Sequence, residues 1–498
     1  SLDYANNPEL SCFAPAMAQF ERMIQQLNGD HLLAAQHGET EAYIHQQGIE
    51  LQRLLMQCHL QRLEQQEQPL PAPPFPEEAQ QQRVRCGAKR TLSTLFGKVT
   101  VSRRSYSAAE HSSVFPIDTQ LNLLKSRYSE GLKWRLAAQA VHCSFDVAQQ
   151  SVSQTCGGHV PKRQSLELIQ DAAQDFETFY QQYQVKECVQ DDLLVLTFDG
   201  KGIVMRLDGL REPTRRKAAA AKGKLKTRLT AGEKRDRKRM AMVAAVYDQP
   251  ARRRTAGDVI GTQSEQVSNR PSPARIQNKR VWASAEREPA AVIEEAFTEA
   301  LKRDPGRRRH WVILVDGQQH QLRLIHNALN RLQIEATIIM DFIHVLEYLW
   351  KAAWCRFKKN DPAAEQWVAE RAFKLLNGDL GQVIKGLRLN IKALAKEKQK
   401  NISKCIHYLS HNRHRLRYAE ALSAGLPIAT GVIEGACRHL INDRLNITGA
   451  RWGLAGAEAM LKLRSIYSSG DWEAYRGYHR QQSYERNYGH LDRLLKAA

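Results

Sequence analysis

The sequence predicts an α/β protein in which a mixed five-stranded sheet is interrupted by an α-helical insertion and preceded by mainly helical modules. Three observations carry this prediction. Short apolar runs alternate with amphipathic helical patterns between residues 190 and 341. Residues 343–424 are helical in pattern and rich in Trp, Leu, Arg and Lys. Residues 14–67 and 128–185 also follow a helical pattern, and a chain of 498 residues has room for two to four domains.

The composition of the chain indicates which kind of partner and which redox compartment to expect. The formal net charge is +20 and the pI is about 9.6, so the chain should bind a polyanion, with nucleic acid the first candidate and a membrane surface the second. No apolar stretch of about 18 residues is present, so no membrane span is expected. The nine cysteines are scattered, odd in number and never in a C-x-x-C pair, which favours a reducing cytosol over a disulfide framework.

The first expected module, residues 1–68, is helical and could dimerise. Ile44, Leu51 and Cys58 stand seven residues apart, as in a coiled coil. A helix packed on its own domain explains the same spacing equally well. The stretch "PLPAPPFPEE" then predicts a stiff linker over residues 69–84, and hence a domain boundary.

Residues 85–188 are expected to bind DNA. Alternation around Phe96 and Gly97 predicts a β-hairpin over residues 90–107. Residues 145–172 then read as helix, Gly-Gly turn and helix, with Lys162 and Arg163 in the first turn of the second helix. In a helix-turn-helix those two cations would reach DNA, whereas in an ordinary helical hairpin they would face solvent.

Residues 189–342 are expected to form the first part of the core. The sequence predicts strands at "DDLLVLTFDG", which ends at Asp199, at "KGIVMRL", at "RMAMVAAVYD", at "WVILVD", which ends at Asp316, and at "EATIIMD", which ends at Asp341. Helices are expected over residues 287–301 and at "QHQLRLIHNALNRL". The expected order is therefore β-β-β-α-β-α-β.

A basic insertion interrupts this core over residues 208–240. Residues 211–240 hold thirteen Lys and Arg against three Asp and Glu. A run of charge is usually a solvated face, but this density of one sign favours a phosphate-contacting or partly disordered segment. The candidate DNA contacts on and beside it are Lys201, Arg215, Arg216, Lys217, Lys224 and Lys226.

The C-terminal part is expected to complete the core. Residues 343–425 form the helical insertion, residues 426–480 the last part of the core, and residues 481–498 a tail. Glu434, Arg438 and His439 lie on one predicted helix, where an acid and cations could meet a phosphate. Arg451 and Trp452 precede the final helix. They could stack on an unpaired base, although a buried Trp that anchors the helix is the commoner outcome.

Three predicted strands end on carboxylates, and ligand sites collect at strand ends in such sheets. The strand order should bring Asp199 beside Asp316. Two carboxylates about 4 Å apart repel by roughly 4 kcal/mol at an effective dielectric of about 20, so a proton or a divalent cation must offset them. Oxygen ligands favour Mg²⁺, for which Mn²⁺ can substitute. Glu434 is the candidate third acid, with Glu347 its nearest rival.

A family resemblance covers most of the chain from about residue 85 to residue 480. The stretches "TFDGKGIVMRLDGLREPTRRKA", "DFIHVLEYLWKAAWC" and "PIATGVIEGACRHLINDRLNITGARWGLAGAEAMLKLRS" resemble ISKra-type insertion-sequence transposases. The resemblance implies a DDE-type enzyme with an RNase H-like catalytic core. It also maps the acidic triad, which would hold Mg²⁺, onto Asp199, Asp316 and Glu434.

A second motif fits the same resemblance. Related transposases with a helical insertion carry (C/D)-x-x-H after the fifth strand, and "DFIH" supplies Asp341 and His344. The resemblance implies a supporting role near the active site. An Asp at a helix N-cap with a core His would explain the same residues.

The expected function is therefore cleavage of insertion-sequence ends and transfer of the freed 3′-OH into target DNA. The expected partners are double-stranded DNA, both terminal repeats and target, and further copies of the chain in a homodimer or larger synaptic complex, in a bacterial cytoplasm near the nucleoid. Two alternatives stay open. One is a structure-selective nuclease on the same fold, and the other is a domesticated DNA-binding protein that performs no chemistry.

Overall fold

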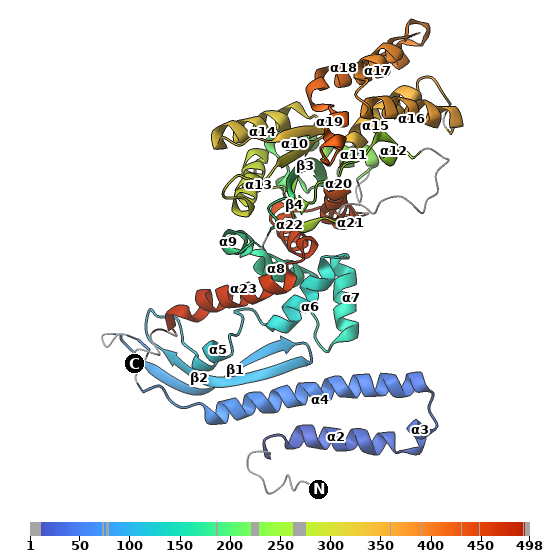
Figure 1. Ribbon diagram of the computed structural model, residues 1–498. Helices are drawn as coiled ribbons and strands as arrows, with labels where there is room; N and C mark the ends of the chain where they lie inside the picture. The colour runs from blue at the N-terminus through green and yellow to red at the C-terminus, as the bar shows by residue number, and fades with distance from the viewer. Residues whose placement is uncertain are drawn as a thin grey trace. The chain divides into compact units, whose positions relative to one another are not determined.

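The computed structural model describes residues 11–71, 74–75, 79–185, 188–220, 229–261, 275–358, 360–389, 391–429, 431–447, 449–491 and 493. The chain divides into two compact units. One comprises Ser1–Gln181 with Glu473–Ala498, and the other comprises Gln182–Trp472 (Figure 1). We call them the terminal unit and the central unit.

The terminal unit begins with helices that pack on a β-hairpin. The expected single helix is divided into α2 (Ala14–Leu27), α3 (Asp30–Leu33) and α4 (His37–Gln66). Helix α4 packs against α2 and along the hairpin strand β2, as Figure 1 shows. The Gln57 side-chain amide exchanges two hydrogen bonds, of 2.8 and 3.0 Å, with the backbone of Thr100. Within the described residues, α4 is thus a helix packed on its own unit.

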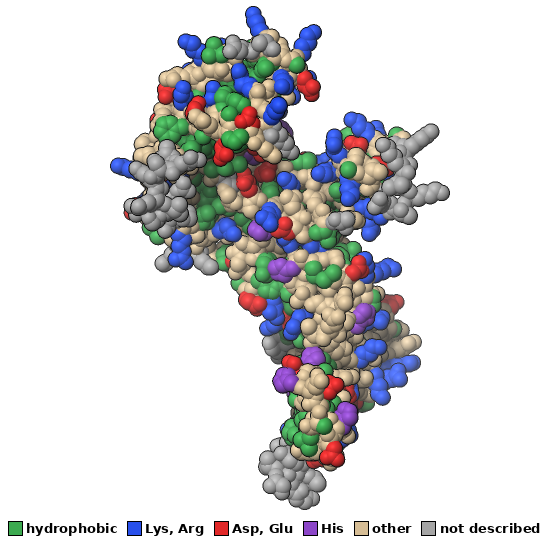
Figure 2. All heavy atoms as spheres, turned by 90° about the vertical axis from the view of Figure 1, so that its right-hand side faces the viewer, with side chains coloured by type: hydrophobic (Ala, Val, Ile, Leu, Met, Phe, Trp, Pro, Cys, Tyr) green, Lys and Arg blue, Asp and Glu red, His purple; other side chains and the backbone are tan. Residues whose placement is uncertain are grey.

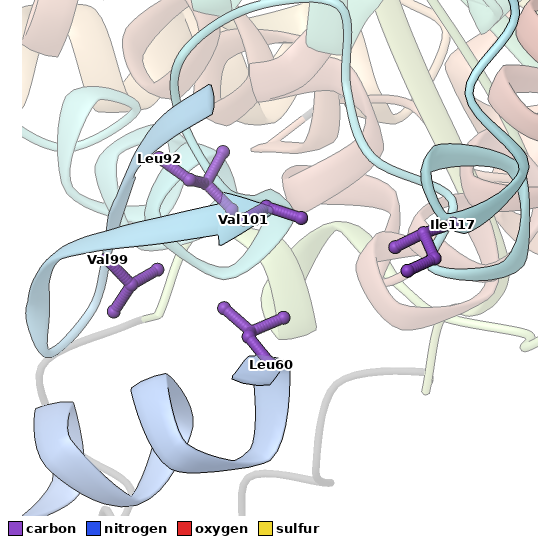
Figure 3. Close-up of a cluster of buried hydrophobic side chains, with 5 residues drawn as sticks. All are labelled: Leu60, Leu92, Val99, Val101 and Ile117. Carbon is purple, nitrogen blue, oxygen red and sulfur yellow. The ribbon is translucent and has the colours of Figure 1, made fainter. Parts of the chain in front are cut away.

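The hairpin lies close to where the sequence placed it. Strands β1 (Arg83–Thr94) and β2 (Gly97–Ser107) pair antiparallel around a turn that Gly97 makes possible with φ +123°. Apolar side chains of both strands point toward α4 and α5 (Pro116–Gln120). Figure 3 shows this cluster, which consists of Leu60, Leu92, Val99, Val101 and Ile117.

A helical group completes the terminal unit. Its helices are α6 (Glu130–Ala140), α7 (Phe145–Thr155), α8 (Lys162–Ala173), α9 (Phe176–Gln182), α23 (Trp472–Tyr484) and the π-helical η6 (Glu485–Gly489). Helices α7 and α8 are the predicted pair, and both pack on α6. The buried Lys133 ammonium lies 2.7 Å from Asp171 and 2.8 Å from the His479 ring. This polar contact fastens α23, from the end of the chain, to α6 and α8.

The central unit is built on a five-stranded mixed sheet. The strands are β3 (Leu193–Val204), β4 (Lys238–Gln249), β5 (Gln277–Ser284), β6 (Trp311–Val315) and β7 (Thr337–Met340), in the order β5-β4-β3-β6-β7. Strands β3, β4 and β5 pair antiparallel, while β3, β6 and β7 pair parallel. The mixed five-stranded sheet expected from the sequence is therefore present.

Two strand assignments differ from the sequence prediction. The expected first and second strands are one continuous strand, β3, so Asp199 lies within it and not at its end. Gly200 and Gly202, at the junction of the two expected strands, lie inside β3 and pair with β4. A Cβ atom at Gly202 would stand 2.8 Å from the Lys238 side chain of β4, so the glycine provides room for a neighbouring strand. Strand β5 was missed because its first half is polar and exposed and only Arg280–Ser284 is buried.

Helices cover the sheet and form the insertion. Helix α13 (Pro289–Arg303) packs on β4 and β3, and α22 (Leu454–Ser469) packs on β5. The insertion comprises α15 (Phe342–Ala353), α16 (Pro362–Leu376), α17 (Leu380–Arg388), η3 (Ile391–Ala393), α18 (Lys396–His411), η4 (Arg413–Arg415) and α19 (Tyr418–Ser423), visible in orange in Figure 1.

The remaining helical elements of this unit are short except for α14. They are η1 (Leu207–Gly209), α10 (Glu212–Ala220), α11 (Ala231–Asp236), α12 (Ala256–Val259), α14 (Gln319–Leu332), α20 (Gly431–Ala436), η5 (Cys437–Asn442) and α21 (Asp443–Leu445). Among the described helices, none combines the length and apolar character needed to cross a bilayer.

Candidate functional site

Asp199 stands beside the junction of the two sheet halves. The parallel pairing of β3 and β6 ends at Thr197 and Leu314, so Asp199 and Asp316 each lie two residues beyond the last pair. One carboxylate oxygen of Asp199 accepts a hydrogen bond from the Gly200 N–H at 2.6 Å. The other accepts from the Cys437 thiol at 3.0 Å. The side chain is thus held from β3 and from the C-terminal part of the core.

Asp316 follows β6 and is fixed on both its side chain and its backbone. Its carboxylate accepts from the Gln318 N–H at 2.9 Å, and its carbonyl accepts from the Tyr408 hydroxyl at 3.0 Å. Burial raises the pKa of Asp316. The negative charge of Asp199 raises this pKa further, while the Gln318 hydrogen bond and His344 oppose the change. Asp316 therefore lies within electrostatic reach of Asp199 and of His344.

Gly317 lets the chain turn at this position, with φ +92°. A Cβ atom here would come 3.1 Å from the Met340 sulfur and 3.1 Å from the Tyr408 ring. The positive φ therefore favours glycine directly after Asp316, and a Cβ atom would also crowd Met340 and Tyr408.

Asp341 links the end of β7 to the start of the insertion. Its N–H donates to the Val315 carbonyl at 2.8 Å, and its carboxylate caps α15 by accepting from the Ile343 N–H at 2.8 Å. His344 lies in the first turn of the same helix and is half-buried. Its Nδ1 atom is buried and has no hydrogen-bond partner among the described residues. The capping interpretation of Asp341 therefore holds, and His344 keeps a nitrogen available to a ligand.

Glu434 completes the group from α20. Donor atoms of Asp341, His344 and Glu434 all lie within 4.8 Å of one another. Partial burial raises the pKa of Glu434, and the carboxylates of Asp341, Glu347 and Asp199 raise it further, while His344 opposes them. We call Asp199, Asp316, Asp341, His344 and Glu434 the acidic cluster.

The helix that carries Glu434 changes geometry within one turn. Helix α20 continues into the π-helical η5, which begins at Cys437. Such π turns often occur at functional sites. Burial and the neighbouring Asp199 raise the pKa of the Cys437 thiol, so it is a neutral hydrogen-bond donor to that carboxylate.

The acidic cluster receives little compensating positive charge. Among the residues that the structure describes, no Lys or Arg forms an ion pair with Asp199, Asp316 or Glu434. Lys201, two residues after Asp199, is half-buried and lies within electrostatic reach of Cys437. The negative charge of Asp199, Asp316 and Glu434 is thus left for a cation or a proton to balance.

The donor set of the cluster suits a hard divalent ion. The carboxylates fit Mg²⁺, and the imidazole of His344 beside Asp341 and Glu434 also suits Mn²⁺. The sequence had grouped Glu434 with Asp199 and Asp316, with Asp341 and His344 in support. The structure places donor atoms of Asp341 and His344 directly beside Glu434.

Trp452 lies in the core and not on a surface. It is 7% exposed, its Nε1 donates to the Leu445 carbonyl at 3.0 Å, and the buried Arg444 guanidinium stands 4.9 Å from its ring. Its ring face is therefore not free to stack on a base, and it anchors the start of α22. Arg451 beside it is exposed.

The other candidate cations are surface residues with acidic neighbours. Lys162 pairs with Asp146 at 2.7 Å, and Arg163 lies 3.5 Å from Glu167. Helix α10 exposes Arg215, Arg216 and Lys217, and its two arginines both pair with Glu212. Arg438 and His439 are exposed and lie 3.6 and 3.2 Å from Asp443. Lys224 and Lys226 lie outside the described residues.

Two residues at the cluster were missed from the sequence. Cys437 stands three residues after Glu434, so helical spacing could have placed it on the same face. Tyr408 lies 92 residues from Asp316 in the sequence, and no local sequence pattern predicts their contact.

Comparison with known proteins gives a partial match. Residues 36–238 match an uncharacterised protein family (UPF0236). No curated protein matches the chain. The matched range includes the hairpin, the α7–α8 pair and Asp199, but ends before the other members of the acidic cluster.

Proposed function

We propose that the chain is a DDE-type DNA transposase whose central unit contains an RNase H-like core interrupted by the helical insertion. One observation carries the proposal. Carboxylates from β3, from the end of β6, from the start of α15 and from α20 meet in one cluster that lacks ion-pair partners among the described Lys and Arg for Asp199, Asp316 and Glu434. The strand order β5-β4-β3-β6-β7 and the resemblance to insertion-sequence transposases support the same reading.

The proposed reaction at the acidic cluster is hydrolysis of a phosphodiester bond, followed by transfer of the freed DNA strand. A divalent ion held by these carboxylates would polarise a phosphodiester and stabilise the leaving oxygen. Water attacks the phosphorus at the element end, the P–O3′ bond breaks, and the leaving 3′ oxygen takes up a proton. That 3′-OH then attacks a target phosphodiester, with one bond formed and one broken in each step. Asp199, Asp316 and Glu434 are the proposed ligands, with Asp341 and His344 beside Glu434.

The charge of the chain supports a DNA substrate. A net charge of +20 attracts a polyanion, and the cations outside the cluster can hold phosphates while the acids hold metal. Assembly into a homodimer or larger complex is part of the proposal, because two element ends must be joined together.

The test uses labelled fragments from either side of the chain's own gene, with a supercoiled plasmid as the target. With Mg²⁺ or Mn²⁺, the full chain should cut the fragments and join their 3′ ends to the plasmid. Asp316→Asn and Glu434→Gln should lower both rates by at least about 10³-fold, equivalent to about 4 kcal/mol of activation free energy, while DNA binding in EDTA stays unchanged.

Glu347→Gln is the matched control. Glu347 is exposed on α15, pairs with Lys351 at 3.2 Å and lies within electrostatic reach of Glu434, so it is the acid most easily mistaken for the third ligand. Its variant should retain activity. Joining by Asp316→Asn would refute the acid assignment. Cutting of branched DNA without any joining would identify a nuclease, and binding without cutting would identify a DNA-binding protein.

A further inference from the structure

Helix α18 of the insertion carries a row of cations that the sequence analysis did not single out. Lys396, Lys400, Lys404, His407 and His411 follow one another at steps of three or four residues, so they share one face of the helix. All five side chains are exposed. We call this row the α18 stripe, and its length is about 22 Å at 1.5 Å per residue.

The opposite face of α18 is fixed in the fold. Ile402, Cys405, Tyr408 and Leu409 are buried there, and the helix packs against α15 and α17. The stripe is therefore presented on a rigid support.

Positive charge in this region is largely uncompensated. Residues 381–418 hold ten Lys and Arg against one acid, Glu397. In the described part of the chain, none of Lys396, Lys400 and Lys404 forms an ion pair. The two arginines of α10 differ, because both pair with Glu212. Figure 2 shows Lys and Arg side chains projecting from the insertion helices at the top of the view. Like charges gathered this way are stabilised by a polyanion.

The stripe is coupled to the acidic cluster through the same helix. Tyr408 stands one turn after Lys404 and donates to the Asp316 carbonyl at 3.0 Å. Its ring also stacks on Tyr348 of α15, with the centroids 4.0 Å apart. Helix α18 thus presents the stripe on its exposed face and contacts Asp316 from its buried face.

We propose that the α18 stripe binds the sugar–phosphate backbone of a DNA duplex without reading its sequence. One strand offers a phosphate every 3.4 Å along the axis, so the stripe faces about six phosphates. Lysines act as point charges for phosphate, whereas base readout needs the bidentate groups of Arg, Asn or Gln. The stripe has no aromatic or aliphatic centre of the kind that protein interfaces require. This inference rests on the proposed DNA substrate.

The test removes three charges and measures the salt dependence of binding. The full chain carrying Lys396→Gln, Lys400→Gln and Lys404→Gln is titrated with a 40-base-pair duplex of random sequence in EDTA, from 50 to 200 mM KCl. Three lost phosphate contacts should flatten the slope of log K against log salt by about 2.7 units. Over this range the wild type would then lose about 40-fold more affinity than the variant.

Two controls separate the stripe from general charge. Lys279→Gln, Lys358→Gln and Lys374→Gln remove three exposed lysines elsewhere in the central unit and should change the slope much less. Replacing the three stripe lysines by Arg should restore the wild-type slope. Thermal melting verifies that each variant is folded. An unchanged slope in the Gln variant would overturn the inference. This holds even if the variant binds poly-glutamate, a polyanion without phosphates, more weakly than the wild type does.

The outcome is independent of the catalytic proposal, because binding is measured without metal. If the wild type cuts and joins DNA but the Gln variant has the wild-type slope, the proposed function stands and the role of the stripe is refuted. If the Gln variant has a flattened slope but the wild type never cuts DNA, the role of the stripe stands and the transposase proposal is refuted.

Discussion

Acidic side chains have different surroundings at the two ends of the parallel strands in the central unit: buried ones at the first end are paired, whereas half-buried ones at the second end are not. Near the start of β3 and β6, Asp248, Glu299 and Asp304 meet arginines or other donors. Past the last β3–β6 pair, Asp199 and Asp316 join the acidic cluster, where no described Lys or Arg forms an ion pair with them. One sheet thus carries both arrangements.

At the first end, Glu299, Asp248 and Asp304 each accept a hydrogen bond from a buried donor. Glu299 accepts from Arg280 at 2.7 Å and from Arg303 at 2.8 Å, and Asp248 accepts from Arg309 at 2.8 Å. Burial by itself would raise the pKa of Glu299, but the two arginines outweigh it and hold the pKa below its ordinary value. Asp304 has a lowered pKa too, because hydrogen bonds from the Trp311 indole and two backbone N–H groups outweigh burial.

At the second end, burial and like charge raise the pKa of Asp316 and of Glu434. Their charged forms therefore cost stability in the protein alone. Acids already paired with arginines cannot also bind a metal strongly, whereas acids without such partners can. The contrast separates a structural charge network from the group that we propose as a metal site.

The largest effect is expected at the paired end. Arg303→Met should lower the free energy of unfolding by about 3 kcal/mol, toward the lower end of the range for breaking a buried pair, because Arg280 stays beside Glu299. The measurement is the urea midpoint of the full chain, followed by tryptophan fluorescence. Because the pKa of Glu299 is lowered, its stabilisation is present above the ordinary carboxyl pKa and is lost as pH falls through the folded value. The difference between wild type and variant should therefore shrink below about pH 4.

Arg331→Met supplies the matched control. Arg331 pairs with Glu294 at 3.1 Å, but both side chains are more than half exposed, at 58% and 54%. Its removal should cost about 0–1 kcal/mol. Equal losses from Arg303→Met and Arg331→Met would show that the buried network contributes no more than a surface pair.

A smaller effect of opposite sign is expected at the acidic cluster. Without metal, Asp316→Asn should raise the free energy of unfolding by roughly 0.5–2 kcal/mol, the range typical of single stabilising substitutions. The pKa of Asp316 is raised in the folded chain, so its charge destabilises the fold once pH exceeds the ordinary carboxyl pKa. Thermal melting at pH 4 and pH 7 should show the advantage of the Asn variant growing with pH.

The same variant tests whether the two ends of the sheet really differ. If Asp316→Asn melts well below wild type at pH 7, Asp316 is a structural residue like Glu299. Added Mn²⁺ gives a second measurement. An ion present at a concentration of 100 times its Kd for the folded wild type stabilises that protein by about 2.7 kcal/mol. The Asn variant should show a much smaller increase.

The sequence predicted the sheet more successfully than its strand limits. Buried runs such as "WVILV" are recognisable because strands covered on both faces are continuously apolar. Strand β5 was missed because it is polar over Gln277–Lys279, and β3 was divided at glycines that in fact make room for β4. Such interstrand contacts depend on a partner 30 or more residues away, which local patterns do not contain.

The same limit applies to the candidate site. Asp199, Asp316 and Glu434 were proposed from strand ends and from a family resemblance, and the structure brings them within electrostatic reach of His344 or of one another. The close approach of Asp341 and His344 to Glu434 could not be seen, because it depends on how α15 and α20 pack. Burial of Trp452 was likewise decided by its contacts with Val204 at the end of β3 and with Arg444, not by its own neighbours in sequence.

The smallest effect tests whether the insertion positions the cluster. Tyr408→Phe removes the hydroxyl that donates to the Asp316 carbonyl and should cost about 0.5–1.5 kcal/mol of stability. Tyr475→Phe is its control in the terminal unit, since that buried hydroxyl donates to the Ala172 carbonyl at 2.7 Å and its loss should cost the same. Only Tyr408→Phe should also lower the cleavage rate, by about tenfold, with the DNA concentration at half-maximal rate unchanged, because a loosened Asp316 impairs chemistry and not binding. Equal cleavage rates in the two variants would mean that α18 does not position Asp316, and that the contrast between the two ends of the sheet arises within the sheet itself.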